Sequence, residues 1–148
     1  MKVARTLGSL ALTNWKLGLH KEGIPHAKCA LEIYGQSGFI LNEAESLYTL
    51  ACLLYGDKQL NAAEDTALRA INLLPDKGEQ FRLCKNYRLL GDIHHSKGEK
   101  EKTVIHLESA IKIASLFNWH YQLSRAHYSL AMEFSDEHRF DDAHTHIE

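Results

Sequence analysis

The sequence is poor in residues that interrupt helices or favour strands. Two prolines and nine glycines are spread over 148 residues, and valine is nearly absent. Leu, Ala, Glu and Lys are abundant instead, and these residues favour helix over sheet. We therefore expect an all-α protein without strands.

A long apolar run is also missing. No uncharged apolar stretch reaches the roughly 18 residues that a membrane span needs, and the N-terminus lacks the apolar core of a signal peptide. These absences predict a cytoplasmic protein with no membrane partner. A chain of 148 residues buries about 70% of its unfolded surface on folding, so we expect one domain over residues 1–148.

The sequence has no paired cysteines. Cys29, Cys52 and Cys84 are odd in number, widely spaced and embedded in helical patterns. This disfavours a disulfide framework and a zinc site built on cysteine pairs. We predict three buried free thiols.

Neither sign of charge dominates the chain. The net charge is −2, so a general attraction to nucleic acid or to an anionic membrane is not expected. Counted in successive blocks of 40 residues, the net charge alternates as +3, −4, +3 and −4. Two interpretations stay open: chance variation on a solvated surface, and complementary charge between neighbouring repeats or with a partner.

What the sequence does contain is a repeat of 40 residues without insertion or deletion. Its clearest columns pair a leucine with a small residue, or hold alanine alone: Leu10-Ala11, Leu50-Ala51, Leu90-Gly91 and Leu130-Ala131, then Ala30, Ala70 and Ala110. Small residues where helices cross, with large apolar residues three or four places away, are what close helix packing needs. The period therefore predicts stacked helix pairs.

Each repeat holds two amphipathic stretches. We expect helices over about 3–19 and 24–34, 42–55 and 61–74, 79–96 and 100–116, and from 119 onward, giving repeat units of about 1–40, 41–80, 81–120 and 121–148. The fourth unit breaks off after the start of its second helix, near 141–148. Two explanations are open: the chain is a piece of a longer repeat protein, or another copy of the chain covers the truncated C-terminal repeat by self-association.

The turns and helix starts have recognisable chemistry. Glycines in 18–23, 56–58 and 97–99 are expected to end helices in the left-handed conformation. Asn42 with Glu45, and Asn61 with Glu64, have the spacing of capping boxes. Pro25 is placed in the first turn of its helix, where its missing N–H is not needed.

At this level of detail the sequence resembles the tetratricopeptide repeats. Tyr87, Leu90, Gly91 and His94 follow the first half of that motif, and Ala63, Ala67, Ala70 and Pro75 follow much of the second. The resemblance covers essentially the whole chain, and the 40-residue period is similar to the long-helix subclass. It implies a right-handed α-solenoid of antiparallel helix pairs, with about 3.5 repeats and seven or eight helices.

The resemblance also implies a function. In this family the first helix of each pair lines a concave groove that takes a peptide or a helix of a partner, which makes the chain a protein-interaction scaffold or adaptor. In this register the expected groove residues are Arg5, Gly8, Leu12 and Trp15; Glu45, Tyr48, Cys52 and Tyr55; Lys85, Arg88, Asp92 and His95; and Arg125, Tyr128, Met132 and Ser135. Aromatic and Arg residues are the usual anchors of such surfaces.

The resemblance includes two more specific functions. The Lys/Asn/Arg clamp that some members use for chaperone tails is matched here only by Lys85, which argues against that ligand. An alternative is that the chain is the sensor or regulatory arm of a larger signalling ATPase or transcription regulator, as the long-helix subclass includes such arms. A nucleotide-binding or DNA-binding domain encoded beside the chain would distinguish that alternative.

Signs of catalysis or of a bound cofactor are absent from the sequence. Neighbouring His94 and His95 point about 100° apart on a helix, and His144 and His146 fall on different faces, so no metal site is expected. His94 occupies a tyrosine column and is predicted to be a packing residue. No phosphate-binding loop, nucleophile elbow or zinc-protease helix occurs. We expect neither an enzyme nor a cofactor.

Overall fold

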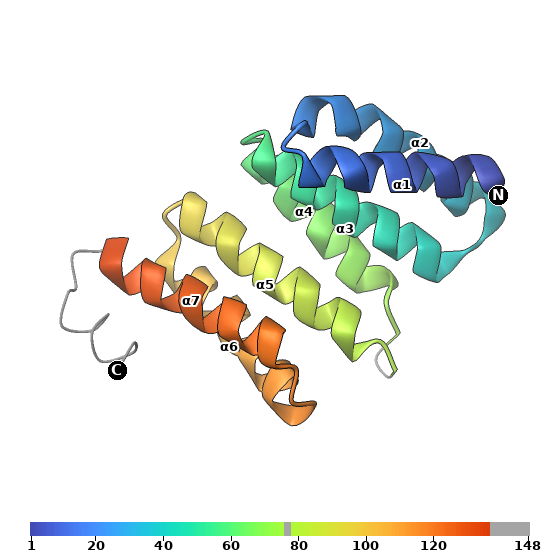
Figure 1. Cartoon of the computed structure of the whole chain (residues 1–148). Helices are drawn as coiled ribbons and strands as arrows, with labels where there is room; N and C mark the ends of the chain where they lie inside the picture. The colour runs from blue at the N-terminus through green and yellow to red at the C-terminus, as the bar shows by residue number, and fades with distance from the viewer. Residues whose placement is uncertain (76–77, 137–148) are drawn as a thin grey trace. The chain divides into compact units, whose positions relative to one another are not determined.

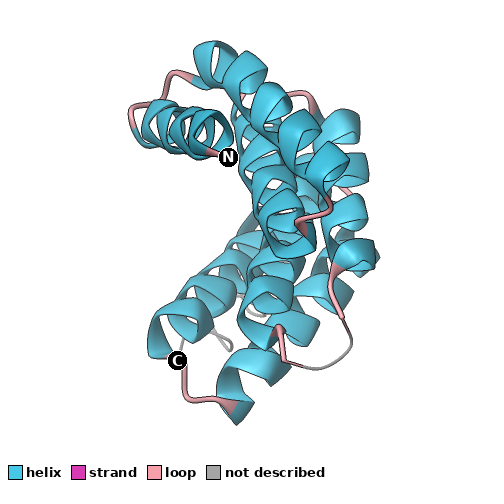
Figure 2. Ribbon diagram, turned by 90° about the vertical axis from the view of Figure 1, so that its right-hand side faces the viewer, coloured by secondary structure: helices cyan, strands magenta, loops and turns pink. Residues whose placement is uncertain are grey.

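In a computed structural model, which describes residues 1–75 and 78–136, the chain consists of helices joined by short turns (Figures 1 and 2). The helices are α1 (Lys2–Lys16), α2 (His20–Ser37), α3 (Ile40–Gly56), α4 (Leu60–Leu73), α5 (Gln80–Ser96), α6 (Lys100–Leu116) and α7 (His120–Asp136). The described part of the chain contains no strand. The predicted all-α fold of helix pairs is confirmed.

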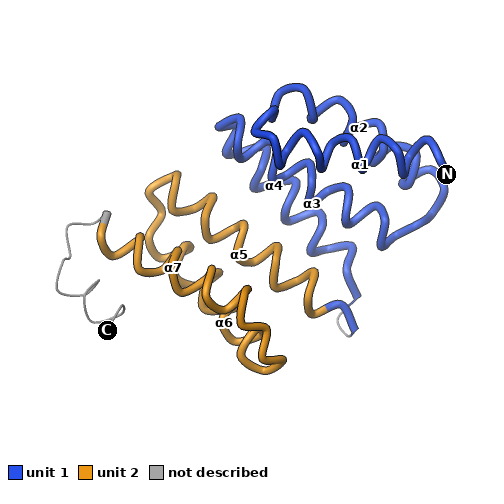
Figure 3. Tube along the Cα trace, viewed as in Figure 1, with its two compact units in different colours: residues 1–79 blue, residues 80–148 orange. Residues whose placement is uncertain are grey.

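The helices form two compact units, residues 1–79 and 80–148 (Figure 3). In unit 1, α1 packs on α2, α2 on α3 and α3 on α4, and α1 also contacts α3. In unit 2, α5 packs on α6 and α6 on α7, and α5 also contacts α7. The first helices of successive pairs therefore lie against each other within each unit. The prediction of one domain over residues 1–148 stays a prediction.

The small-residue columns are packing positions, as the period predicted. Ala30, Ala70 and Ala110 are each 0% exposed. The leucine column is buried at Leu50, Leu90 and Leu130. Leu10 on α1 differs, with 41% of its surface exposed. The columns thus bury small side chains where each helix crosses its neighbour.

One pair of repeat columns holds side chains of different size in the two units. Unit 1 places Ala51 of α3 and Ala67 of α4 at these positions, both 0% exposed, whereas unit 2 has Gly91 on α5 and Leu107 on α6. A Cβ added at Gly91 would lie 2.5 Å from Leu107 Cδ2. The larger leucine is therefore accommodated because its neighbour has no side chain.

The turns repeat every 20 residues rather than every 40. Positive φ angles occur in the described chain at Gly18, Gly38, Lys58, Gly78, Gly98 and Asn118. At five of these six turns, the residue that follows the one with positive φ has two roles. Its N–H donates to the carbonyl five residues back, and its carbonyl accepts from the N–H four residues on, as in Leu19→Asn14 at 2.8 Å and Gly23→Leu19 at 3.1 Å. One residue thus closes one helix and opens the next.

The predicted turn chemistry is right at two places and wrong at a third. Gly18 and Gly98 have φ of 76° and 77°, as expected for glycines that end helices. Gly56 instead lies inside α3, and the left-handed residue of that turn is Lys58, with φ of 65°.

The predicted helix starts near 24, 42 and 61 lie one to four residues too far along the chain, whereas the start predicted at 100 is right. Asn42 and Asn61 are inside helices whose N-caps are Phe39 and Gln59, and neither cap has a side-chain hydrogen bond, so the capping boxes are wrong. Pro25 was also misplaced, because α2 begins at His20 and the proline lies beyond its first turn. The shared turn residue makes side-chain caps unnecessary, since it starts each helix through its own carbonyl.

Two of the three thiols are buried as predicted, and one is not. Cys52 and Cys84 are buried, but Cys29 is exposed on α2, so the prediction for Cys29 is wrong. All three are free. The difference follows from rotation about the helix, because Ala27 and Ala30 occupy the inward positions on either side of Cys29.

Within the described residues, each helix is either too short or too polar to cross a membrane. The predictions for the second helix of the fourth unit, for His144 and His146, and for self-association through the C-terminal repeat fall on residues 137–148, outside the described part of the chain.

Candidate partner-binding surface

Large apolar side chains are exposed mainly on the first helices of the pairs. On α1, α3, α5 and α7 the exposed ones are Val3, Leu10, Leu12, Trp15, Ile40, Leu41, Phe81, Tyr121, Tyr128 and Met132. On the second helices α2, α4 and α6 they are Leu68, Ile105 and Leu116. Exposed apolar area on a helix face marks interaction sites. Among the described helical residues, the four first helices expose ten large apolar side chains and the three second helices expose three. The first helices are therefore the candidate binding surface.

In unit 1 the predicted groove residues differ in exposure. Leu12 and Trp15 of α1 are 40% and 38% exposed, and Arg5 is exposed as well. On α3, Tyr48 and Tyr55 are half-buried and Cys52 is buried. In this unit α1 therefore offers the more accessible anchors.

In unit 2, three residues of α5 that were predicted to face a partner contact side chains of α7 instead. Arg88 Nε donates to Gln122 Oε1 at 3.2 Å, and His95 Nδ1 contacts the Glu133 carboxylate. Asp92 accepts a hydrogen bond from Ser129. We call these three pairs the α5–α7 polar seam. The seam therefore links α5 to α7 through side-chain contacts.

Asp92, in the middle of the seam, is a carboxyl group whose charged form is disfavoured by burial. Burial raises the pKa of Asp92, and the hydrogen bond from Ser129 and the charges of Arg88, Arg125 and His95 only partly offset that burial. Arg88 Nη1 lies 3.8 Å from Asp92 Oδ2. The carboxylate is thus held in a setting that disfavours its charge despite the nearby cations.

The remaining predicted residues of unit 2 are more accessible. Tyr128 is 66% exposed and Met132 39% exposed. Arg125 is exposed, and its Nη1 donates to the Tyr121 hydroxyl at 3.1 Å. Lys85 Nζ lies 5.3 Å from the centre of the Phe81 ring. Tyr128, Met132 and Arg125 are therefore the accessible members of this set.

An aromatic cluster that the repeat pattern did not predict lies beside these residues. Phe81 meets Trp119 edge to face at 5.1 Å, and Phe117 stacks on Trp119 at 4.7 Å. Phe81 and Phe117 are 45% and 49% exposed. A signal was present, since Phe81 and Tyr121 share one column of the 40-residue repeat.

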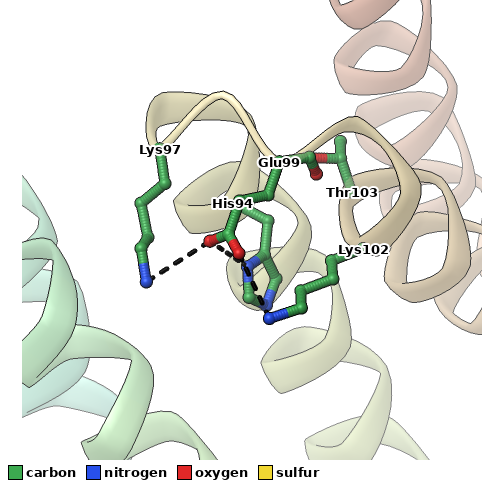
Figure 4. Close-up of polar contacts among 5 residues, drawn as sticks. All are labelled: His94, Lys97, Glu99, Lys102 and Thr103. Atoms are coloured by element: carbon green, nitrogen blue, oxygen red, sulfur yellow. Dashed lines mark hydrogen bonds and ion pairs between the residues drawn. The ribbon is translucent and has the colours of Figure 1, made fainter.

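A second cluster lies at the turn between α5 and α6 (Figure 4). The Glu99 carboxylate contacts Lys102 Nζ at 3.1 Å and both Lys97 Nζ and His94 Nδ1 at 3.3 Å. These partners, Lys102 first, lower the pKa of Glu99 to about 2. Glu99 also starts α6, where its carbonyl accepts from the Thr103 hydroxyl at 2.9 Å. The cluster stabilises a turn.

The aromatic columns of unit 2 form part of its core. His94 is 2% exposed and stacks on His106 with ring centres 5.0 Å apart, which confirms its predicted packing role. Tyr87 packs against the buried cluster that includes Cys84 and Ala126. Tyr87 is therefore part of the core, as its position in the repeat predicted.

A family model described as tetratricopeptide repeat matches residues 2–76. The chain belongs to the tetratricopeptide repeat family. The matched segment spans α1 to α4, and the same alanine and leucine columns continue to be buried beyond it at Leu90, Ala110 and Leu130. A search of curated proteins found no match to the chain. Tetratricopeptide repeats are in general protein-interaction modules.

Proposed function

We propose that this tetratricopeptide repeat chain is an interaction module that binds a segment of a partner protein on its first helices. The observation that carries the proposal is the asymmetry of exposed apolar side chains, ten on first helices and three on second helices of the described chain. A helix that keeps large apolar groups in water gains free energy when a partner covers them, roughly 25 cal/mol per Å².

The residues proposed to bind are those of the predicted groove that remain accessible. On unit 1 these are Leu12 and Trp15, and on unit 2 they are Arg125, Tyr128 and Met132. The two tyrosines of α3 contribute less area because they are half-buried. Arg88, Asp92 and His95 support the site mainly by joining α5 to α7.

The test is capture of partners from a cell extract by the full chain, compared with variants of the first helices. Tyr128→Ala with Met132→Ala removes two exposed side chains of α7. If both are anchors, binding of any captured partner should weaken by about 2–4 kcal/mol. The matched control is Ile105→Ala with Leu116→Ala, which removes comparable exposed apolar groups from α6.

Loss with the α7 variant and retention with the α6 variant supports the proposal. The same loss with both variants, or loss only with the α6 variant, overturns it. Circular dichroism and thermal unfolding check that each variant is folded before its binding is compared.

A further inference from the structure

Helix α1 exposes a side that its equivalents in the later repeats bury. Val3, Leu10 and the C-cap residue Leu17 are seven residues apart, so they follow one side of the helix. They are 63%, 41% and 68% exposed. Thr6 and Thr13 lie on the same side and are exposed as well. We call these five residues the α1 stripe.

The later first helices bury the middle of this stripe. The column of Leu10 is buried on α3, α5 and α7, as described above. The columns of Thr6 and Thr13 are buried on the same three helices, at Ser46 and Leu53, Asn86 and Ile93, and Ala126 and Glu133. The repeat therefore uses this side of a first helix for packing.

Within each unit, a second helix contributes to the cover at these positions. A Cβ added to Gly23 of α2 would lie 2.8 Å from Leu53 Cδ2, so Leu53 of α3 packs directly on α2. In unit 2, Ala126 of α7 shares a buried cluster with Ala110 and Ala114 of α6. The surface that fits the α1 stripe is therefore a second helix with small residues where the helices cross.

The sequence of the fourth unit contains the equivalent of such a second helix. Ala143 falls in the same column of the 40-residue repeat as Gly23, Ala63 and Thr103, which are all buried. The column thus offers a small residue to the next first helix. By sequence register, residues 141–148 correspond to the part of α2 that packs on α3.

The charges of the two ends of the chain are complementary. Residues 1–19 contain three Lys or Arg side chains and no Asp or Glu, a net charge of +3. Residues 129–148 contain six Asp or Glu and one Arg, a net charge of −5. Two α1 helices packed on each other would bring like charges together, whereas α1 packed on the fourth unit brings opposite charges together.

We propose that the chain self-associates head to tail, with the α1 stripe of one copy packed on the fourth unit, residues 121–148, of a second copy. The apolar side chains of the stripe leave water at this contact, and the cations of α1 meet the acidic segment. Because the two patches differ, the contact is heterologous, and each added copy leaves one patch of each kind exposed.

This contact is separate from the proposed function. Leu12 and Trp15, which are proposed to bind a partner, lie two residues from Leu10 and Leu17 and so face another side of α1. Self-association and partner binding therefore use different surfaces of the same helix, and either proposal can fail without the other.

The first experiment is sedimentation velocity of the full chain over a range of concentrations, which should show species that grow beyond a dimer. Leu10→Glu with Leu17→Glu should raise the dissociation constant at least about tenfold, because two carboxylates would be buried at the contact. The matched control is Ile105→Glu with Leu116→Glu, which adds the same charges at exposed apolar positions of α6. It should change the dissociation constant by less than about twofold.

The second experiment mixes two variants that each lack one patch. Asp141→Lys with Asp142→Lys reverses charge on the fourth unit and should also be monomeric by itself. An equimolar mixture with the Leu10→Glu and Leu17→Glu variant should form a dimer and grow no further, since one intact stripe meets one intact fourth unit. Pairing of α1 with α1 would instead leave the stripe variant monomeric in the mixture.

Four results overturn the inference. They are a chain that stays monomeric up to about 1 mM, equal loss of association in the α6 control, the absence of a dimer in the mixture, and a stripe that mediates co-sedimentation with phosphatidylserine–phosphatidylcholine vesicles while the chain stays monomeric. Circular dichroism of each variant shows whether it is folded, and the mixture tests both variants for a working second patch.

Discussion

The turn positions with positive φ differ in how well their residues suit that conformation. Four of the six in the described chain are glycine, and Asn118 is the next best residue for it, but Lys58 carries a long side chain at φ of 65°. A left-handed backbone costs an L-residue about 1–2 kcal/mol relative to glycine. Lys58 therefore retains strain that its equivalents avoid.

Replacing Lys58 with glycine should raise the free energy of unfolding by about 1 kcal/mol, since the strain falls while glycine gains some unfolded-state entropy. Urea unfolding followed by circular dichroism measures it. Lys58→Ala is the matched control, because it removes the side chain but keeps the Cβ, and it should change little. A gain of similar size from alanine would mean that the side chain, and not the backbone angle, limits stability.

Glu99 gives unit 2 a pH-dependent element. Its pKa in the folded chain is about 2, below the ordinary value of 4.5, with Lys102 as the main cause. A lowered carboxyl pKa adds stability that is fully present above pH 4.5 and is lost as the pH falls toward 2. The unfolded chain then takes up the proton first.

Changing Glu99 to Gln should therefore lower Tm at neutral pH, and the gap between the two proteins should narrow as the pH falls below 4.5. Thermal unfolding at a series of pH values measures the gap. The control Glu101→Gln removes an exposed negative charge from the same first turn of α6. A Glu99 gap that stays constant down to low pH would contradict the assigned ion contacts.

Two glycine turns were predictable from residue type alone, but the residue that replaces glycine at another turn was not. Gly18 and Gly98 were identified because glycine is the usual left-handed residue. At 56–58 the same rule selected Gly56, whereas the 20-residue spacing of the turns selects Lys58. The position of the left-handed residue therefore follows the 20-residue spacing of the turns more closely than it follows glycine. That spacing can be read from the sequence.

At the scale of helix pairs, the two units fill equivalent positions with side chains of different size. Gly91 on α5 lies against Leu107 on α6, and the equivalent positions of unit 1 hold Ala51 on α3 and Ala67 on α4, both buried. Since Leu107 is 0% exposed, it has no room to move from a new methyl group at position 91. The two positions should be energetically coupled.

Gly91→Ala is expected to destabilise the chain by about 1–3 kcal/mol through overpacking, and Leu107→Ala by about 2–5 kcal/mol through loss of buried contacts. The double variant reproduces the alanine pair of unit 1. It should cost less than the sum of the single changes by at least about 1 kcal/mol. Urea unfolding of all four proteins completes the cycle, and simple additivity would show that the two sites do not share one space.

Element type followed from the sequence, whereas contacts between elements did not. The columns of Ala and Leu predicted which face of each helix is buried, and Ala30, Ala70 and Ala110 confirm it. The seam contacts Arg88–Gln122 and His95–Glu133 join residues 34 and 38 positions apart. Such pairs depend on how α5 and α7 are rotated against each other, which the period alone does not determine. Arg88 and His95 were therefore predicted as groove residues without their partners.

At the scale of the whole chain, charge is nearly balanced in sum but uneven in place. The net charge is −2, yet residues 80–91 and 117–132 carry only positive charges. The net charge of +3 in residues 81–120 arises from the three cations of residues 81–91, because the other four Lys side chains of that block are balanced by four Asp and Glu side chains. Local charge, more than the total, should govern how a charged partner approaches.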